Sequence, residues 1–159
     1  MENQRLITAY FEADHDRLDS LFRHFQLHKR SDMEKAKSYF KVFLQGLKRH
    51  IVWEEEVLFP FFEGKSGMPQ GTGPTAVMRS EHRQIEQTLE AIHEKVRQKD
   101  PGSDQEEKAL LEVLGAHNMK EENILYPAID QAASPQDAAD IFRAMENVPQ
   151  TSFAGCCGS

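Results

Sequence analysis

The chain has 159 residues and a formal net charge of −7, which is enough length for one domain with a single core. The negative charge argues against nucleic acid or an anionic membrane as a partner. No apolar run approaches the roughly 18 residues of a membrane-spanning helix, and the N-terminus lacks the basic start and apolar stretch of a signal peptide. The two cysteines, Cys156 and Cys157, are adjacent and cannot form a disulfide framework, so we expect a cytoplasmic protein.

The first predicted helix covers residues 4–29. Its apolar residues recur at intervals of three, four or seven positions and therefore form one stripe along the helix. His15 lies on this stripe, four residues after Phe11. His24 and His28 lie off the stripe and are expected in solvent.

The second predicted helix begins after Ser31, which could form a capping box with Glu34, and runs to about residue 62. Pro60 is expected to kink or stop this helix. The Pro- and Gly-rich segment 63–74 then separates the chain into two halves. These halves are residues 1–63 and residues 74–131.

Two further long helices are predicted at about residues 74–98 and 105–131, followed by a short helix over residues 135–147. Together these elements make one domain, residues 1–149, before an irregular tail over residues 150–159. Four long helices with modest connections predict an all-α, antiparallel up-down-up-down four-helix bundle with a short fifth C-terminal helix.

One sequence motif, called the repeated phrase below, occurs twice in the chain, at residues 50–60 and 117–127. Both copies read His-x-x-x-Glu-Glu-x-[Val/Ile]-Leu-[Phe/Tyr]-Pro, and they lie 67 residues apart. The same offset pairs two single histidines, His15 and His82. A fixed offset across most of the chain indicates an internal repeat, which relates the two halves by a pseudo-twofold axis.

Helix geometry selects one glutamate from each copy of the phrase. Residues four apart face the same side of a helix, about 6 Å apart along its axis. His50 therefore projects together with Glu54, and His117 with Glu121. The next acid in each copy points about 140° away and is expected in solvent. These two acids are Glu55 and Glu122.

A bundle with this repeat brings the inward-facing residues of both halves together in the core. Two buried carboxylates repel each other, and burying them unpaired is costly. A pair of divalent metal ions compensates this charge, and neutral imidazoles are suitable ligands for such ions. The predicted metal ligands are His15, His50, Glu54, His82, His117 and Glu121. Asp19 and Glu86, four residues after the two single histidines, could be additional ligands or could orient the histidines.

Each part of this pattern also has an ordinary structural interpretation. A single inward histidine is usually a core residue, and a single His-x-x-x-Glu pair usually lies on a helix surface. The whole set at one fixed offset favours a metal site instead. The aromatic residues of the stripes, and Trp53, are interpreted as core packing.

The sequence resembles the hemerythrin-like family, the HHE cation-binding domain, over about residues 5–130. The resemblance rests on Asp14-His15, on Glu81-His82 and on the two repeated phrases. It implies a four-helix bundle that holds a non-haem di-iron centre with an oxo or hydroxo bridge. The four histidines would be terminal ligands, and the two selected glutamates would bridge the irons. Oxygen-carrying members have a further histidine where this chain has Glu86, so the chain is more similar to the wider group.

The ligand types predict a di-iron protein that binds or reduces O2, NO or peroxide for sensing, storage or detoxification. If the protein is an enzyme, we expect a di-iron oxidoreductase of the peroxidase, catalase or NO-reducing type. The alternative is iron sensing or iron handling through a labile di-iron site, because metal binding couples to folding. Iron delivery to damaged clusters is a third class, for which the resemblance implies an additional cysteine-bearing domain before the bundle. The paired cysteines are interpreted as incidental, with a redox or metal-transfer role as the alternative.

Overall fold

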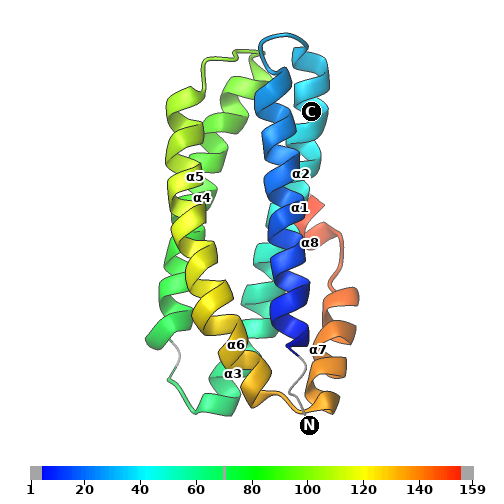
Figure 1. Cartoon of the computed structure of the whole chain (residues 1–159), viewed down its shortest axis with the longest axis vertical. Coiled ribbons are helices and arrows are strands. Elements are labelled where there is room, and N and C mark those ends of the chain that lie inside the picture. The colour runs from blue at the N-terminus through cyan, green and yellow to red at the C-terminus, as the bar shows by residue number, and fades with distance from the viewer. Residues whose placement is uncertain (1–4, 70, 155–159) are drawn as a thin grey trace.

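A computed structural model describes residues 5–69 and 71–154, and helix is the only regular secondary structure in these ranges. The elements are α1 (Leu6–His28), α2 (Met33–Trp53), η1 (Glu54–Leu58), α3 (Phe59–Ser66), α4 (Gly73–Arg97), α5 (Asp104–Lys120), η2 (Glu121–Leu125), α6 (Tyr126–Ala132), α7 (Pro135–Glu146) and α8 (Thr151–Ala154). The predicted all-helical bundle is confirmed. Helices α1 and α2 lie side by side, as do α4 and α5, and the chain reverses direction from each of these helices to the next (Figure 1).

Two of the long helices contain a single turn of π-helix, η1 and η2, at the glutamates of the repeated phrase. The carbonyl of Glu54 accepts a hydrogen bond from the N–H of Phe59, five residues later. The carbonyl of Glu121 accepts the equivalent bond from Tyr126. Such wide turns are rare and occur frequently at functional sites. Both copies of the phrase therefore adopt the same uncommon backbone.

The helical path after the first phrase is longer than expected. Pro60 was expected to kink or stop the helix, but it lies in the first turn of α3, and the helical path continues to Ser66. A proline is tolerated in a first turn because its missing N–H has no helical partner there. The path ends at Gly67, whose φ of 67° is left-handed and favours glycine. The break between the halves is therefore shorter than residues 63–74.

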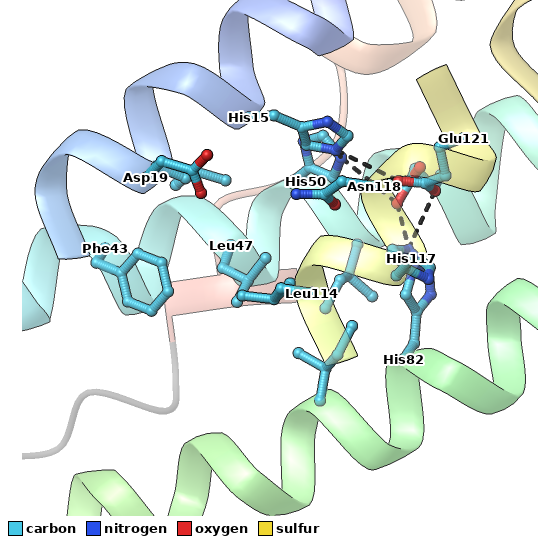
Figure 2. Close-up of a pocket in the computed structure, with 14 residues that line it drawn as sticks. His15, Asp19, Phe43, Leu47, His50, His82, Leu114, His117, Asn118 and Glu121 are labelled. Atoms are coloured by element: carbon cyan, nitrogen blue, oxygen red, sulfur yellow. Dashed lines mark hydrogen bonds and ion pairs between the residues drawn. The ribbon is translucent and has the colours of Figure 1, made fainter. Parts of the chain in front are cut away.

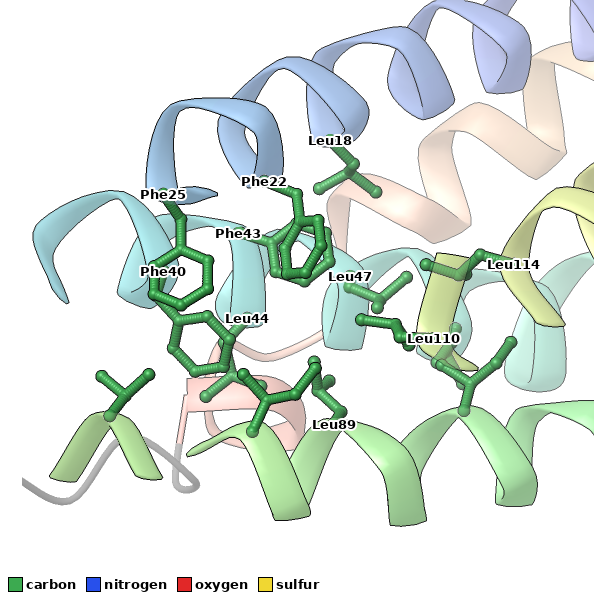
Figure 3. Close-up of a cluster of buried hydrophobic side chains, with 14 of the residues drawn as sticks. Leu18, Phe22, Phe25, Phe40, Phe43, Leu44, Leu47, Leu89, Leu110 and Leu114 are labelled. Carbon is green, nitrogen blue, oxygen red and sulfur yellow. The ribbon is translucent and has the colours of Figure 1, made fainter. Parts of the chain in front are cut away.

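The core is divided into two clusters, one on each side of the level of His15. The upper cluster in the orientation of Figure 1 packs apolar residues of α1, α2, α4 and α5 (Figure 3). The lower cluster joins α1, α3, α4, α6 and α7. The aromatic residues interpreted as core packing are all buried, and Trp53 donates its indole N–H to the carbonyl of Met145. They are Phe11, Phe22, Phe25, Phe40, Phe43 and Phe59.

Two helix starts are held by acids from the far end of the other half. The backbone N–H groups of Ile7 and Thr8 donate to the Asp130 carboxylate at 2.9 Å, and the Thr8 hydroxyl donates to it at 2.6 Å. In α4 the hydroxyl of Thr75 donates to Glu63 at 2.8 Å. Thr75 follows Thr8 by 67 residues, and Asp130 follows Glu63 by 67 residues, so the repeat extends to these anchors.

The remaining differences concern helix ends. The N-cap of α2 is Asp32, which accepts from the N–H of Lys35, and not Ser31. Residues Thr151–Ala154 form the short helix α8 against α2, although residues 150–159 were expected to be irregular. Cys156 and Cys157 lie outside the described residues. Within the part of the chain that the structure describes, no helix is long and apolar enough to cross a membrane.

Candidate metal centre

The structure brings the predicted inner residues of both halves together between the two core clusters. The histidines come from the four long helices, α1, α2, α4 and α5, and the two glutamates open the π turns. All six side chains are buried, and Glu54 and Glu121 are 0 % exposed. Their ligand atoms form two groups, each with all atoms within 4.8 Å of one another. One group is Glu54, His82, His117 and Glu121, and the other is His15, His50 and Glu121.

Glu121 lies between the histidines of the two halves (Figure 2), and Glu54 also contacts a histidine from each half. An oxygen of Glu54 lies 3.1 Å from Nε2 of His82 and 3.5 Å from Nε2 of His50. Oxygens of Glu121 lie 3.3 Å from Nε2 of His15 and 3.2 Å from Nε2 of His117. Each glutamate therefore contacts one histidine from each half of the chain. Glu121 belongs to both ligand groups and reaches the two histidines with different oxygens, as a carboxylate shared between two metal ions would, whereas Glu54 belongs to one group and contacts both histidines with the same oxygen.

A second set of four carboxylates surrounds the histidines and binds the opposite edge of each ring. We call this set the outer ring. Nδ1 of His50 donates to Asp14 at 2.8 Å, and Nδ1 of His117 donates to Glu81 at 2.9 Å. The other two partners, Glu55 for His82 and Glu122 for His15, come from the opposite half and lie at 2.6 and 3.2 Å. Because Nδ1 of each ring is occupied by an outer carboxylate, Nε2 is the atom of the neutral imidazole that is left to bind a metal ion on the interior side.

The outer ring corrects one expectation. Glu55 and Glu122 were expected in solvent, yet both are partly buried and bind histidines. The ring also obeys the 67-residue offset, because Asp14 pairs with Glu81 and Glu55 pairs with Glu122. A comparison of the two halves beyond the inner ligands could have identified these four acids. The helical wheel of one half alone could not, because the partner histidine of Glu55 is in the other half.

Arginine or lysine side chains pair with three of the four outer-ring carboxylates, Asp14, Glu55 and Glu81. Burial raises the pKa of Asp14, but the hydrogen bond with His50 and the charge of Arg17 outweigh burial and hold this pKa below its usual value. The same balance lowers the pKa of Glu55, which binds His82 and Arg83. Lys120 also pairs with the Glu81 carboxylate. The outer ring therefore supplies negative charge that strengthens the imidazoles as donors to a cation.

The inner residues show the electrostatic conflict expected of buried acids. Burial and the neighbouring charge of Glu121 raise the pKa of Glu54. Burial lowers the pKa of His15 and His82, but their carboxylate partners outweigh it and raise these pKa values to about 9 and about 10. Nε2 of His15 and Nε2 of His50 face each other at 3.1 Å, an arrangement that suits two ligands of the same cation. The second oxygen of Glu121 is buried and accepts no hydrogen bond from the described residues.

Tyr126 is the functional candidate that the sequence analysis missed. Its hydroxyl is fully buried, 2.7 Å from Glu54 and 2.9 Å from Glu121, and 3.2 Å from Nε2 of His50. The equivalent residue of the first half is Phe59, which has no hydroxyl. The signal was present as the Phe/Tyr alternation in the repeated phrase. The hydroxyl makes one side of the centre more polar than the other.

Asp19 and Glu86 do not join the inner site. Asp19 is exposed and lies at the rim of the cavity beside His15, away from the network of carboxylates and imidazoles (Figure 2). Glu86 lies 3.4 Å from Arg83 on the surface. In α1 and α4 the four residues after the histidine lead toward the upper core cluster, whereas in α2 and α5 they lead toward the lower cluster, so Asp19 and Glu86 are displaced in the direction opposite to the inner glutamates. The orienting role considered for them belongs to the outer ring.

These features define a helix-bundle protein with a buried histidine and carboxylate site suited to metal cations. Residues 6–129 match the family model described as the hemerythrin HHE cation binding domain, and the chain belongs to this family. Comparisons with curated proteins and with solved structures found no match.

Proposed function

We propose that the six inner residues hold two iron ions with an oxo or hydroxo bridge. The observation that carries this proposal is that each buried glutamate contacts one histidine from each half of the chain. Four imidazoles and two carboxylates suit first-row metals, and iron in particular where coordination positions stay open. The outer ring supports the assignment because it fixes all four Nε2 atoms toward the interior.

We further propose that the protein binds or reduces small oxidants, namely O2, NO or peroxide. The iron pair supplies reversible binding or two-electron exchange with such molecules. The chain contributes a small cavity beside the ligands, and its apolar walls exclude bulk water and larger substrates. The Tyr126 hydroxyl holds a proton close to Glu54, where a bound oxidant could accept a hydrogen bond. The apolar wall residues are Leu18, Phe43, Leu47, Ile51, Ile85 and Leu114.

Metal analysis combined with optical spectroscopy of the iron-loaded protein, with and without O2 and NO, tests both proposals. We expect iron binding and a spectral response to small ligands in the parent protein. Both should be lost in the double variant His50→Ala/His117→Ala. The matched control is His24→Ala, because His24 is exposed and stacks on Tyr39 away from the centre. Undiminished iron binding in the double variant contradicts the di-iron assignment.

Iron handling through a labile site is the second candidate, and the burial of the two inner glutamates favours it. Two fully buried carboxylates destabilise the metal-free fold, so iron occupancy should change stability strongly. Thermal melting of metal-free and iron-loaded protein measures this coupling. A large stabilisation by iron, with no spectral response to O2, NO or peroxide, would favour iron handling over oxidant binding.

A further inference from the structure

Two surface grooves flank the bundle, and the 67-residue repeat relates one to the other. The first lies between α1 and α5 and has a volume of about 390 Å³. The second lies between α2 and α4 and has a volume of about 340 Å³. Seven lining positions correspond at the offset: Asp19 and Glu86, Phe22 and Leu89, Arg23 and Glu90, Leu111 and Leu44, Gly115 and Lys48, Asn118 and Ile51, Met119 and Val52.

The two grooves differ in how they meet the cavity beside the inner ligands. The α1/α5 groove shares His15, Asp19, Leu114 and Asn118 with the lining of that cavity, and His15 is one of the inner ligands. Among the described residues, the α2/α4 groove shares only Ile51 with it. These four shared residues form the partition between the α1/α5 groove and the centre, and three of them are polar. The α2/α4 groove ends at a buried apolar side chain.

The closing side chains explain this difference. Ile51 is 5 % exposed and packs into the upper core cluster, whereas its counterpart Asn118 is only partly buried. Ser152, which belongs to α8, lines the α2/α4 groove and has no counterpart in the α1/α5 groove. The second groove is thus closed from inside by Ile51 and partly covered from outside by the C-terminal helix.

The grooves also differ at Gly115, where close packing does not require a glycine. It lies in the middle of α5, and a Cβ atom built on it would meet nothing within 4 Å. Gly46 of α2 contrasts with it, because a Cβ there would lie 2.7 Å from Leu18. A glycine inside a helix lowers stability relative to alanine, so Gly115 has a cost that close packing does not explain. Its effect is an open groove floor where the other half has Lys48.

We propose that the α1/α5 groove is the entry route by which small neutral molecules reach the metal centre, while the α2/α4 groove is closed. This proposal rests on the proposed binding of small oxidants. Asp16, Asp19 and Glu122 line the groove, and Arg23 is the one arginine or lysine among the lining side chains, so the groove disfavours anions. The apolar cavity walls behind the partition suit neutral diatomic molecules and hydrogen peroxide.

The test measures the association rate of NO with the iron-loaded protein by stopped-flow absorbance. Gly115→Leu fills the groove floor and should slow association on the order of tenfold, which corresponds to about 1.4 kcal/mol in barrier height. Gly115→Ala controls for the change in helix propensity, and Lys48→Leu places the same side chain in the α2/α4 groove. Both controls should keep the parent rate. Iron content and the equilibrium NO spectrum should be the same in all four proteins.

A second measurement addresses the charge of the groove. Asp19→Asn should increase the association rate of azide, an anion, and leave the NO rate unchanged. An unchanged NO rate in Gly115→Leu, or equal slowing by Lys48→Leu, overturns the entry route. A parent protein that binds iron but gives no spectral response to NO or azide instead refutes the proposed function, so the two failures are distinguishable.

Discussion

The two halves of the chain are alike around the centre and differ at its approaches. The inner ligands, the outer ring, the π turns and the threonine anchors all recur at the 67-residue offset. Core positions recur too, but Phe11 and Phe22 correspond to Met78 and Leu89, so the first half is more aromatic. One position beside the ligands differs in its hydrogen-bonding group, because Tyr126 has a hydroxyl where the equivalent Phe59 has none. Ligand geometry follows the repeat, and the surroundings of the ligands distinguish its two sides.

The largest expected effect is the loss of metal on removing the carboxylate that we propose is shared. Because Glu121 contacts histidines of both halves, Glu121→Ala should abolish binding of both proposed iron ions. His15→Ala removes a ligand from one side only and should leave part of the iron bound. Iron per chain, measured after gel filtration, checks this expectation. The control is Glu56→Ala, which removes an exposed acid from the same π turn as Glu54. A half-loaded Glu121→Ala protein would show that the carboxylate is not shared.

The metal-free protein should lose stability in alkali because of the inner histidines. The pKa values of His15 and His82 are raised to about 9 and about 10 in the folded state, since their carboxylate contacts outweigh burial. The stability that the two protonated rings contribute is therefore fully present below about pH 6.5 and is lost as the pH rises through about 9 to 10. Denaturant unfolding of metal-free protein across this range measures the loss. His15→Gln and His82→Gln should each reduce the pH dependence. If the free energy of unfolding depends on pH in both variants as it does in the parent protein, the two histidines are not the source of the alkaline loss of stability.

The outer ring should affect metal affinity by similar amounts in the two halves. Asp14→Asn and Glu81→Gln each weaken the hydrogen bond to one ligand histidine, and outer partners of this kind typically change metal affinity about 10- to 100-fold. Competition with a chelator measures the affinity. The matched control is Glu86→Gln, because Glu86 contacts Arg83 and none of the ligand histidines among the described residues. An equally large loss in the control would return Glu86 to the candidate ligands.

The grouping of the six inner residues could be predicted from the sequence because helix periodicity and a fixed offset determine which residues face the core. The outer ring could not be predicted in the same way. The wheel of one helix places Glu55 away from His50, and only the packing of α2 against α4 brings it to His82. Pro60 does not stop the helix, because a π turn precedes it and places the proline in the first turn of α3, an arrangement that α-helical rules do not include. Tyr126 looked interchangeable with Phe59 in an apolar position, although its hydroxyl ends between two buried acids.

The two helix anchors should differ in strength although they are related by the repeat. Asp130 accepts two backbone N–H groups and one hydroxyl and is 7 % exposed, whereas Glu63 accepts from Thr75 and Arg79 and is more exposed. Pro74, the counterpart of Ile7, has no N–H to be satisfied. Asp130→Ala should therefore lower the free energy of unfolding by about 2 kcal/mol or more, and Glu63→Ala should lower it by about 1 kcal/mol or less. Denaturant unfolding measures both changes, and equal losses of stability in the two variants would contradict the expected difference between the anchors.

The last variant should change fold and metal content least, and it tests whether the Tyr126 hydroxyl makes the two sides of the centre different. Tyr126→Phe gives both halves a phenylalanine, and it removes a hydroxyl that contacts Glu54 and Glu121. The variant keeps the aromatic ring at position 126 and all six inner residues, so iron content should be unchanged. The visible spectrum and the NO association rate should shift, because one side of the centre loses its hydrogen-bond donor. Phe59→Tyr is the matched control, since it adds a hydroxyl at the equivalent position on the other side. If Tyr126→Phe leaves the spectrum and the NO rate at their parent values, the hydroxyl does not differentiate the two sides, and the asymmetry is confined to the grooves.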